Sequence, residues 1–210
     1  MNMKRTKNTL ITILLGCLIA AMTGFIFSQS SKSGEESASL SGKVTVWILA
    51  VWGKIISQTP PEVGSTAFEI VHILIRKLAH FTEFFVLGAL WLSFISSITG
   101  RVEWRKMQCS LKAPDEDDGF IKREKIRRAV YFFLPPCVGL LTAIADECMQ
   151  IFSLERGPSA LDVGIDFLGV CAGIVVAHAL IYLLFYRQKK AKTDQEKGTV
   201  YETNAKKRGL

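Results

Sequence analysis

The sequence lacks most of the features that mark soluble enzymes and secreted domains. It has no internal repeat, no CxxC pair, no HExxH motif, no P-loop and no serine nucleophile elbow. It therefore gives no motif-level sign of a thiolate zinc site, a metalloprotease, a P-loop nucleotide-binding enzyme or a serine hydrolase. Its five cysteines are an odd number, and four of them fall in apolar stretches. This excludes the disulfide framework of a small secreted domain.

Apolar residues are abundant, and they come in long runs. Of the 210 residues, 49% are hydrophobic and 21% are charged, and the two kinds alternate in blocks. This composition excludes a disordered or collagen-like chain. Four runs are long enough for a membrane-spanning helix, which needs about 20 residues; they lie at 10–27, 78–98, 129–152 and 160–186. We therefore predict an all-α, polytopic membrane helix bundle with four transmembrane helices.

The distribution of basic residues predicts how the bundle is inserted. Twenty of the 26 Lys and Arg residues lie in the N-terminal segment, in the 99–128 loop or after residue 186, and six lie in the other connections. The positive-inside rule then places both termini in the cytoplasm of a multi-pass protein of the cell membrane. The net charge of +7 is thereby explained without nucleic acid as a partner. An uncleaved first helix is favoured over a signal peptide, because no A-x-A-like site follows it.

The domain organisation follows from the same pattern. We expect a transmembrane domain over 1–186 and a basic, disordered cytoplasmic tail over 187–210. Residues 28–42 are rich in Ser and Gly, which predicts an extended loop. Residues 44–56 have apolar side chains at helical spacing. They predict a short amphipathic helix, which either lies in the membrane interface or packs on the bundle.

The second long helix is predicted to begin well before its apolar run. Ser65 or Thr66 is a suitable N-cap, with Glu69 three or four residues further on. A helix from residue 66 to 98 is roughly 50 Å long at 1.5 Å per residue, whereas the hydrocarbon core is about 30 Å thick. The helix must therefore project, tilt or break.

Ionisable residues inside the apolar runs are the candidate functional residues. Because a charge at the bilayer centre costs several kcal/mol, such residues usually face a bundle interior or water. Glu69, His72, Arg76, His80 and Glu83 follow one another at three- or four-residue spacing and so share one helix face. Further acids occur at this spacing near the outer ends of the third and fourth runs. The predicted polar cluster comprises Arg76, Lys77, His80, Glu83, Asp146, Glu147, Gln150, Arg156, Asp162 and Asp166.

Two glycines extend the same face of the fourth run. Gly169 and Gly173 are four residues apart, which forms a small-xxx-small pattern. Such a pattern lets a neighbouring helix approach closely within a membrane, and we therefore assign these glycines to helix packing.

Three blocks of the sequence resemble the VanZ-like membrane proteins. They are FSQSSKSGEES at 27–37, RKLAHFTEFFVLGAL at 76–90 and AIADECMQIFSLERGPSALDVGIDFLGVCAG at 143–173. The resemblance covers most of the chain outside the 99–128 loop and the tail. Its motifs implicate the residues of the polar cluster other than Asp166, together with Gly169. It implies a bacterial cell-envelope protein, in a family linked in some members to low-level resistance to the glycopeptide antibiotic teicoplanin.

Three functional hypotheses stand beside a purely structural polar network. In the first, an outward-facing polar site binds a lipid head group, a cell-wall precursor or a glycopeptide, and so reduces glycopeptide susceptibility. In the second, the protein is a membrane enzyme that acts on a lipid-linked or cell-wall precursor substrate. There His80 is the acid or base, Glu83 orients it, and Asp146 or Asp162 lies near. The basic residues that would hold a phosphate or carboxylate are Arg76, Lys77 and Arg156.

The third hypothesis is a bound divalent cation. Carboxylates together with an imidazole are suitable ligands for such ions, and the ligands would come from His80, Glu83, Asp146, Asp162 and Asp166. We rank it below the others, because basic residues already neutralise part of the cluster. No cofactor is therefore predicted, and the sequence leaves open whether the protein is an enzyme.

Overall fold

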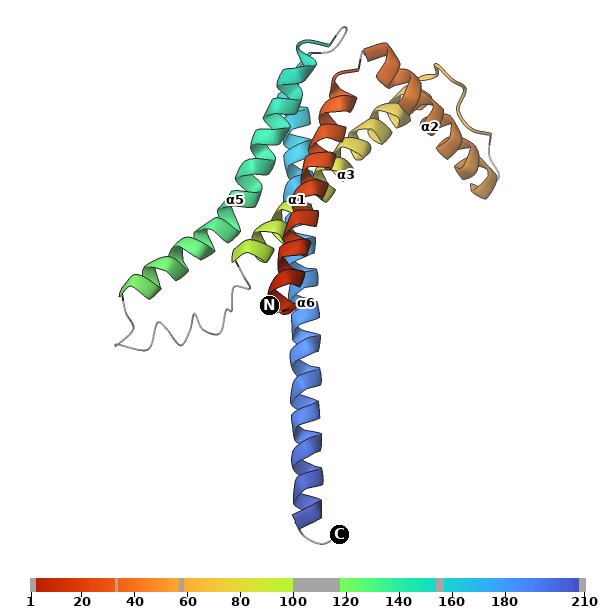
Figure 1. The fold of residues 1–210 in the computed structure, drawn as a ribbon. Coiled ribbons are helices and arrows are strands. Elements are labelled where there is room, and N and C mark those ends of the chain that lie inside the picture. Colours follow the sequence, from red (N-terminus) through yellow and green to blue (C-terminus); the bar gives the residue numbers. More distant parts are fainter. Residues whose placement is uncertain (1–2, 33, 57–58, 100–117, 154–156, 208–210) are drawn as a thin grey trace. The chain divides into compact units, whose positions relative to one another are not determined.

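The structure is a computed structural model, and it describes residues 3–32, 34–56, 59–99, 118–153 and 157–207. All regular secondary structure in these ranges is helical (Figure 1). The helices are α1 (Met3–Ser30), α2 (Gly34–Ile56), α3 (Thr66–Thr99), α5 (Asp118–Gln150) and α6 (Ala160–Lys207). Four stretches are long and apolar enough to cross a membrane, at Asn8–Ser30, Thr66–Thr99, Lys122–Gln150 and Ala160–Leu184. The predicted all-α fold with four spans is confirmed.

Helix α3 begins where the capping signal indicates. The backbone N–H of Phe68 donates a hydrogen bond to Ser65 Oγ at 3.3 Å, so Ser65 is the N-cap. Gly64 precedes it with a φ of 87°, a left-handed conformation that glycine adopts without strain. The helix then runs unbroken for 34 residues. Since this exceeds the length needed to cross the hydrocarbon core, α3 carries a first part, in which polar and apolar residues are mixed, before the predicted run that starts at residue 78.

The prediction of an extended loop over 28–42 is wrong. Helix α1 continues to Ser30, and α2 begins at Gly34, ten residues before the predicted amphipathic helix. The reason lies in the contact between α2 and α3. Ser41 Oγ and His72 Nε2 share a hydrogen bond of 2.6 Å, and Thr45 and Leu49, one and two turns further on, are buried. This packing outweighs the low helix propensity of Ser and Gly.

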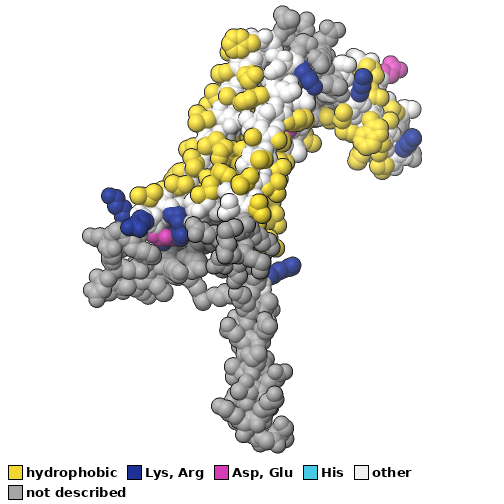
Figure 2. All heavy atoms as spheres, in the orientation of Figure 1, with side chains coloured by type: hydrophobic (Ala, Val, Ile, Leu, Met, Phe, Trp, Pro, Cys, Tyr) yellow, Lys and Arg dark blue, Asp and Glu magenta, His cyan; other side chains and the backbone are white. Residues whose placement is uncertain are grey.

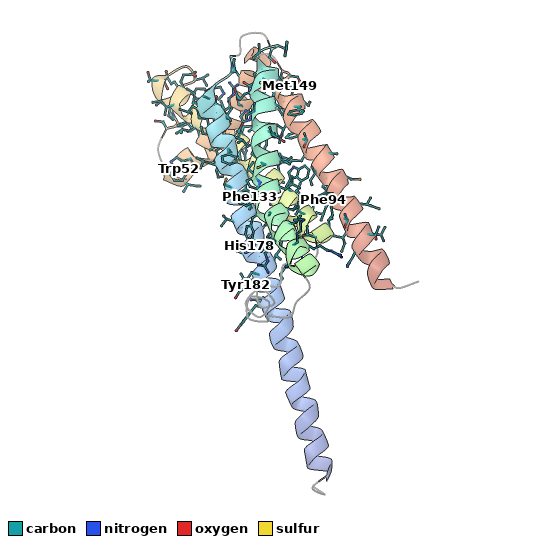
Figure 3. The ribbon with its side chains drawn as sticks, turned by 90° about the vertical axis from the view of Figure 1, so that its left-hand side faces the viewer. Trp52, Phe94, Phe133, Met149, His178 and Tyr182 are labelled. Atoms are coloured by element: carbon teal, nitrogen blue, oxygen red, sulfur yellow. The ribbon has the colours of Figure 1, made fainter. Side chains whose placement is uncertain are left out.

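The opposite face of α2 is apolar and exposed. The side chain of Trp47 is 68% exposed and that of Ile55 69%. Trp52 also lies on α2 (Figure 3). Figure 2 shows hydrophobic side chains over α2 as well as over the faces of the long helices. The helix therefore combines the two arrangements left open by the sequence, because one face packs on α3 and the other has the amphipathic character of an interfacial helix.

The hydrophobic core brings together the four spanning helices. It contains Ile26 of α1, Phe84 and Leu87 of α3, Ala143 of α5 and Val170 of α6, all buried. Phe94 of α3 packs against this core (Figure 3). These contacts hold the helices that carry the polar residues.

Helices α3 and α6 approach each other at backbone distance. A Cβ atom added at Gly169 would collide with the carbonyl oxygen of Phe81, and one at Gly173 with that of Phe85. From the other side, a Cβ at Gly88 would collide with the carbonyl oxygen of Val170. Gly169 and Gly173 thus lie where only glycine fits, as small-xxx-small packing requires.

Helix α5 begins within the predicted 99–128 loop. It starts at Asp118, so the basic run before the third span is helical, while residues 100–117 lie outside the described part of the chain. Pro135 and Pro136 lie inside the helix, and Figure 1 shows it changing direction along its length. Proline explains such a bend, because it removes a backbone donor and its ring clashes with the preceding turn.

The chain divides into two compact units, Met1–Ile174 and Val175–Leu210. The first contains the core and all the described residues of the polar cluster. The second, taken by itself, is the later part of α6, with exposed apolar side chains such as Leu180 and Leu184. Here the sequence predicts a disordered tail from residue 187, whereas the structure continues as a helix to Lys207. The frequent Lys, Gln, Glu and Ala residues of this segment favour a helix.

Candidate functional site

The polar residues gather at one end of the first unit. The hydroxyl of Ser30, the last residue of α1, donates to Asp146 Oδ1 at 2.6 Å, near the end of α5. Ser153 Oγ, just beyond α5, donates to the carbonyl oxygen of Ser30 at 2.9 Å. Helix α6 begins at the same place and faces α3. The site thus lies beside α3, where α1 and α5 end and α6 begins.

A first group of residues fixes the corner between α5 and α6. Glu147 Oε1 accepts from Gln150 Nε2 at 2.8 Å, and Glu147 Oε2 accepts from the backbone N–H of Ser159 at 2.8 Å. Ser159 is the N-cap of α6, because its Oγ accepts from the N–H of Asp162 at 3.3 Å. In a capping box, the residue three after the cap would bond the cap N–H. Glu147 of the preceding helix takes that role here, which leaves the side chain of Asp162 for another partner.

That partner is Lys77 of α3. The Lys77 ammonium forms an ion pair with Asp162 Oδ1, joining residues 85 positions apart. Both side chains are roughly a third or more exposed. The pair links α3 to the first turn of α6 and neutralises one of the five acids of the cluster.

A second group lies deeper between the helices. His80 and Glu83 are one turn apart on α3, with His80 Nδ1 3.8 Å from Glu83 Oε2. Asp146 and Asp166 are buried. His80, Asp146 and Asp166 each place one nitrogen or oxygen atom within 4.8 Å of the other two. Three helices therefore direct titratable side chains at one point.

Next to these groups is a cavity of about 310 Å³. Its lining comes from α3, the end of α5, Gly157 and the start of α6. The residues are Ile73, Arg76, Lys77, His80, Glu147, Gln150, Gly157, Asp162, Ile165 and Asp166. The volume is at the lower end of the range for small-molecule sites, which is about 300–1,000 Å³. Arg76 makes no ion pair with any described residue, and its guanidinium is thus a donor group at the cavity wall.

The predicted polar face of α3, formed by Glu69, His72, Arg76, His80 and Glu83, divides between two places. Arg76, Lys77 and His80 line the cavity, whereas His72 bonds Ser41 of α2. Glu69 lies 3.9 Å from His72 and belongs with it. This polar face therefore contributes residues both to the site and to the contact between α3 and α2. Arg156, predicted to lie above the cluster, falls outside the described residues.

The sequence interpretation missed the hydroxyl groups of the site. Ser30 and Ser153 bond across 116 and 123 positions of the chain, and no local pattern predicts such pairs. Ser159 was detectable in principle, because it is three residues before Asp162 and follows Gly157-Pro158, which together resemble a helix start.

Comparisons with known proteins identify the family to which the chain belongs. No curated protein and no solved structure matches it. The sequence model of the VanZ/LLP1 family matches residues 13–186, which include the four spanning segments almost entirely and every residue of the site. Since the match covers most of the 210 residues, the chain belongs to the VanZ/LLP1 family.

Proposed function

We propose that this chain is a cell-envelope protein whose polar cavity binds the anionic head group of a membrane lipid or of a lipid-linked cell-wall precursor. Binding, without chemical change, would reduce susceptibility to glycopeptides such as teicoplanin. The resistance part of the proposal is supported by the resemblance to VanZ-like proteins. The head-group part is supported by the chemistry of the cavity.

The observation that carries the proposal is the position of Arg76. Its guanidinium lines the cavity and is not paired with any acid that the structure describes. A guanidinium binds phosphate and carboxylate through paired N–H groups. A cavity of about 310 Å³ accepts a head group, whereas it would enclose only a part of a glycopeptide antibiotic. This favours the lipid or precursor over the drug as the bound partner.

Access to the extracytoplasmic side is supported by the opposite end of the bundle. There Thr12 Oγ is 3.0 Å from Ser97 Oγ, and Arg127 Nη1 donates to the carbonyl oxygen of Thr99 at 3.3 Å. The starts of α1 and α5 and the end of α3 therefore meet at this second end. It carries the basic run 122–128, visible at the start of α5 in Figure 2. By the positive-inside rule this end is cytoplasmic, so the cavity would open outward.

A susceptibility assay tests the proposal. The gene is expressed in a teicoplanin-susceptible bacterium, and the inhibitory concentration is compared for the wild type, Arg76→Gln, Glu83→Ala and Asp146→Ala. Glu69→Gln, on the α2-facing part of α3, is the matched control. We expect the wild type and the control to raise the inhibitory concentration and the three site variants to lose the effect at equal membrane levels. An unchanged value for Arg76→Gln would overturn the proposal.

A second candidate function is enzymatic. It is favoured by His80, which lines the cavity and whose Nδ1 lies 3.8 Å from Glu83 Oε2. A carboxylate beside a histidine orients the ring and stabilises its protonated form, as acid–base catalysis requires. The purified protein would then convert a labelled lipid-linked precursor, and His80→Gln would abolish the product. A wild type that releases no product with any divalent metal added would exclude this candidate.

A further inference from the structure

Three residues of the site are close enough to bind one metal ion. His80, Asp146 and Asp166 each offer one ligand atom, and these atoms lie within 4.8 Å of one another. Around an ion with metal–ligand distances of about 2.0–2.2 Å, adjacent ligand atoms are about 3 Å apart and opposite ones about 4 Å. Separations of up to 4.8 Å are longer than these, so a bound ion would draw the three atoms together. We infer that His80, Asp146 and Asp166 form a binding site for a single divalent cation.

The burial of Asp166 beside Asp146 favours a bound cation. Asp146 is 0% exposed and Asp166 2% exposed. Asp166 Oδ1 is buried and accepts no hydrogen bond from any described residue. Two carboxylates held close together in an apolar surrounding are costly unless a cation pairs with them. Lys77 pairs with Asp162, and a divalent cation would place positive charge beside Asp166.

A surrounding group orients one of the three ligands, and a carboxylate lies near a second. Ser30 Oγ donates to Asp146 Oδ1, which holds that carboxylate against rotation. Glu83 Oε2 lies 3.8 Å from His80 Nδ1, so a further carboxylate lies beside the imidazole. Hydrogen-bonded partners such as Ser30 fix the orientation of metal ligands, and a carboxylate near a ligating imidazole can do so once it forms a hydrogen bond. The site therefore has both ligands and a supporting shell.

The ligand types indicate which cation fits. Imidazole suits Zn²⁺ and similar ions, and carboxylates suit Mn²⁺, Mg²⁺ and Ca²⁺. One imidazole with two carboxylates is therefore best matched by Zn²⁺ or Mn²⁺. Three protein ligands leave coordination positions open, and His80 and Asp166 also line the cavity. A cation there would attract an anionic head group. That role rests on the proposed function, but the presence of the cation does not.

The test measures metal binding by the tag-free, detergent-purified full chain. The protein is stripped with a chelator and titrated separately with Zn²⁺, Mn²⁺, Mg²⁺ and Ca²⁺. The bound metal is quantified by mass spectrometry and the affinity by calorimetry. We expect about one Zn²⁺ or Mn²⁺ per chain. X-ray absorption of the wild-type complex should show a mixed nitrogen and oxygen shell, a readout that needs no variant.

Two variants and two matched controls locate the ion. Asp166→Asn removes a ligand charge at nearly constant volume, and His80→Asn removes the imidazole; each should weaken binding at least tenfold. Glu69→Gln and His72→Asn alter the other histidine–carboxylate pair of α3, 3.9 Å apart, and should bind as the wild type does. Size-exclusion profiles show whether each variant is folded.

Either of two results would overturn the inference. One is a stripped wild type that binds none of the four ions, since the two carboxylates would then share a proton instead of a cation. The other is a folded Asp166→Asn variant that binds as tightly as the wild type. A resistance assay without effect would refute the proposed function and leave the metal measurement unchanged, so the two failures are distinguishable.

Discussion

Ser30 and Asp146, 116 positions apart in the chain, are joined by a hydrogen bond of 2.6 Å from the serine hydroxyl to Asp146 Oδ1. Both residues are fully buried. The bond links the last residue of α1 to the polar cluster near the end of α5, so the first helix has a direct part in shaping the site. The bond therefore makes the end of α1 part of the site.

We predict that Ser30→Ala destabilises the protein. The variant removes a donor from a buried carboxylate, and an acceptor left without its partner costs about 1–3 kcal/mol. The free energy of unfolding should fall by that amount, and the melting temperature in detergent should fall with it. Ser31→Ala is the neighbouring control, because Ser31 is exposed and bonds the carbonyl oxygen of Phe27 in its own turn. Equal melting temperatures for Ser30→Ala and the wild type would contradict the prediction.

The spanning helices could be predicted from the sequence because the membrane imposes a simple rule. A run of about 20 apolar residues is both necessary and visible, and all four runs correspond to helices. The ends were harder to predict. The start of α3 at Thr66 was predicted, because Ser65 is a recognisable N-cap. The start of α2 at Gly34 was not, because it lies inside the predicted loop over 28–42.

The site was predictable to the extent that its residues follow helical spacing. Arg76 and His80 share a face because they are four residues apart, and so do Asp162 and Asp166. Helical spacing does not predict which residue of another helix a side chain contacts. Lys77 was predicted to lie in the cluster, but its pairing with Asp162 depends on how α3 and α6 pack. The helical start of α2 was missed for the same reason, since it depends on His72 of another helix.

Close packing of α3 and α6 predicts a strong effect of one added methyl group. In Gly173→Ala, the new Cβ would collide with the carbonyl oxygen of Phe85, and a backbone atom cannot move aside without shifting the helix. Overpacking of this kind costs about 1–3 kcal/mol. The melting temperature of Gly173→Ala should therefore fall clearly below that of the wild type.

Gly164→Ala is the control for this substitution. It lies on the same helix, but a Cβ there meets no atom within 4 Å. Alanine is a better helix former than glycine by about 1 kcal/mol, so this variant should be as stable as the wild type or more so. If Gly173→Ala were as stable as Gly164→Ala, the helices would not approach as closely as the structure has them.

The ion pair between Lys77 and Asp162 predicts a rescue by charge exchange. Lys77→Asp alone places a second carboxylate beside Asp162 and should lower the melting temperature, whereas Lys77→Asp with Asp162→Lys restores an opposite pair. Because the side chains are 34% and 40% exposed, the coupling free energy from a double-mutant cycle should be modest, about 0.2–1 kcal/mol. A coupling indistinguishable from zero would mean that the two residues do not interact.

The exposed face of α2 predicts that this helix contacts lipid near the membrane surface. Trp47, 68% exposed, has the amphipathic ring that favours the interface, and Lys43 and Lys54 lie near the two ends of the apolar face. In a variant with Trp47 as its sole tryptophan, lipids brominated close to the head group should quench the fluorescence more than lipids brominated deep in the chain. A variant that keeps only Trp91, which packs against the core, is the control and should be quenched less. Efficient quenching of Trp47 by aqueous acrylamide, with none by the brominated lipids, would show that this face lies in water.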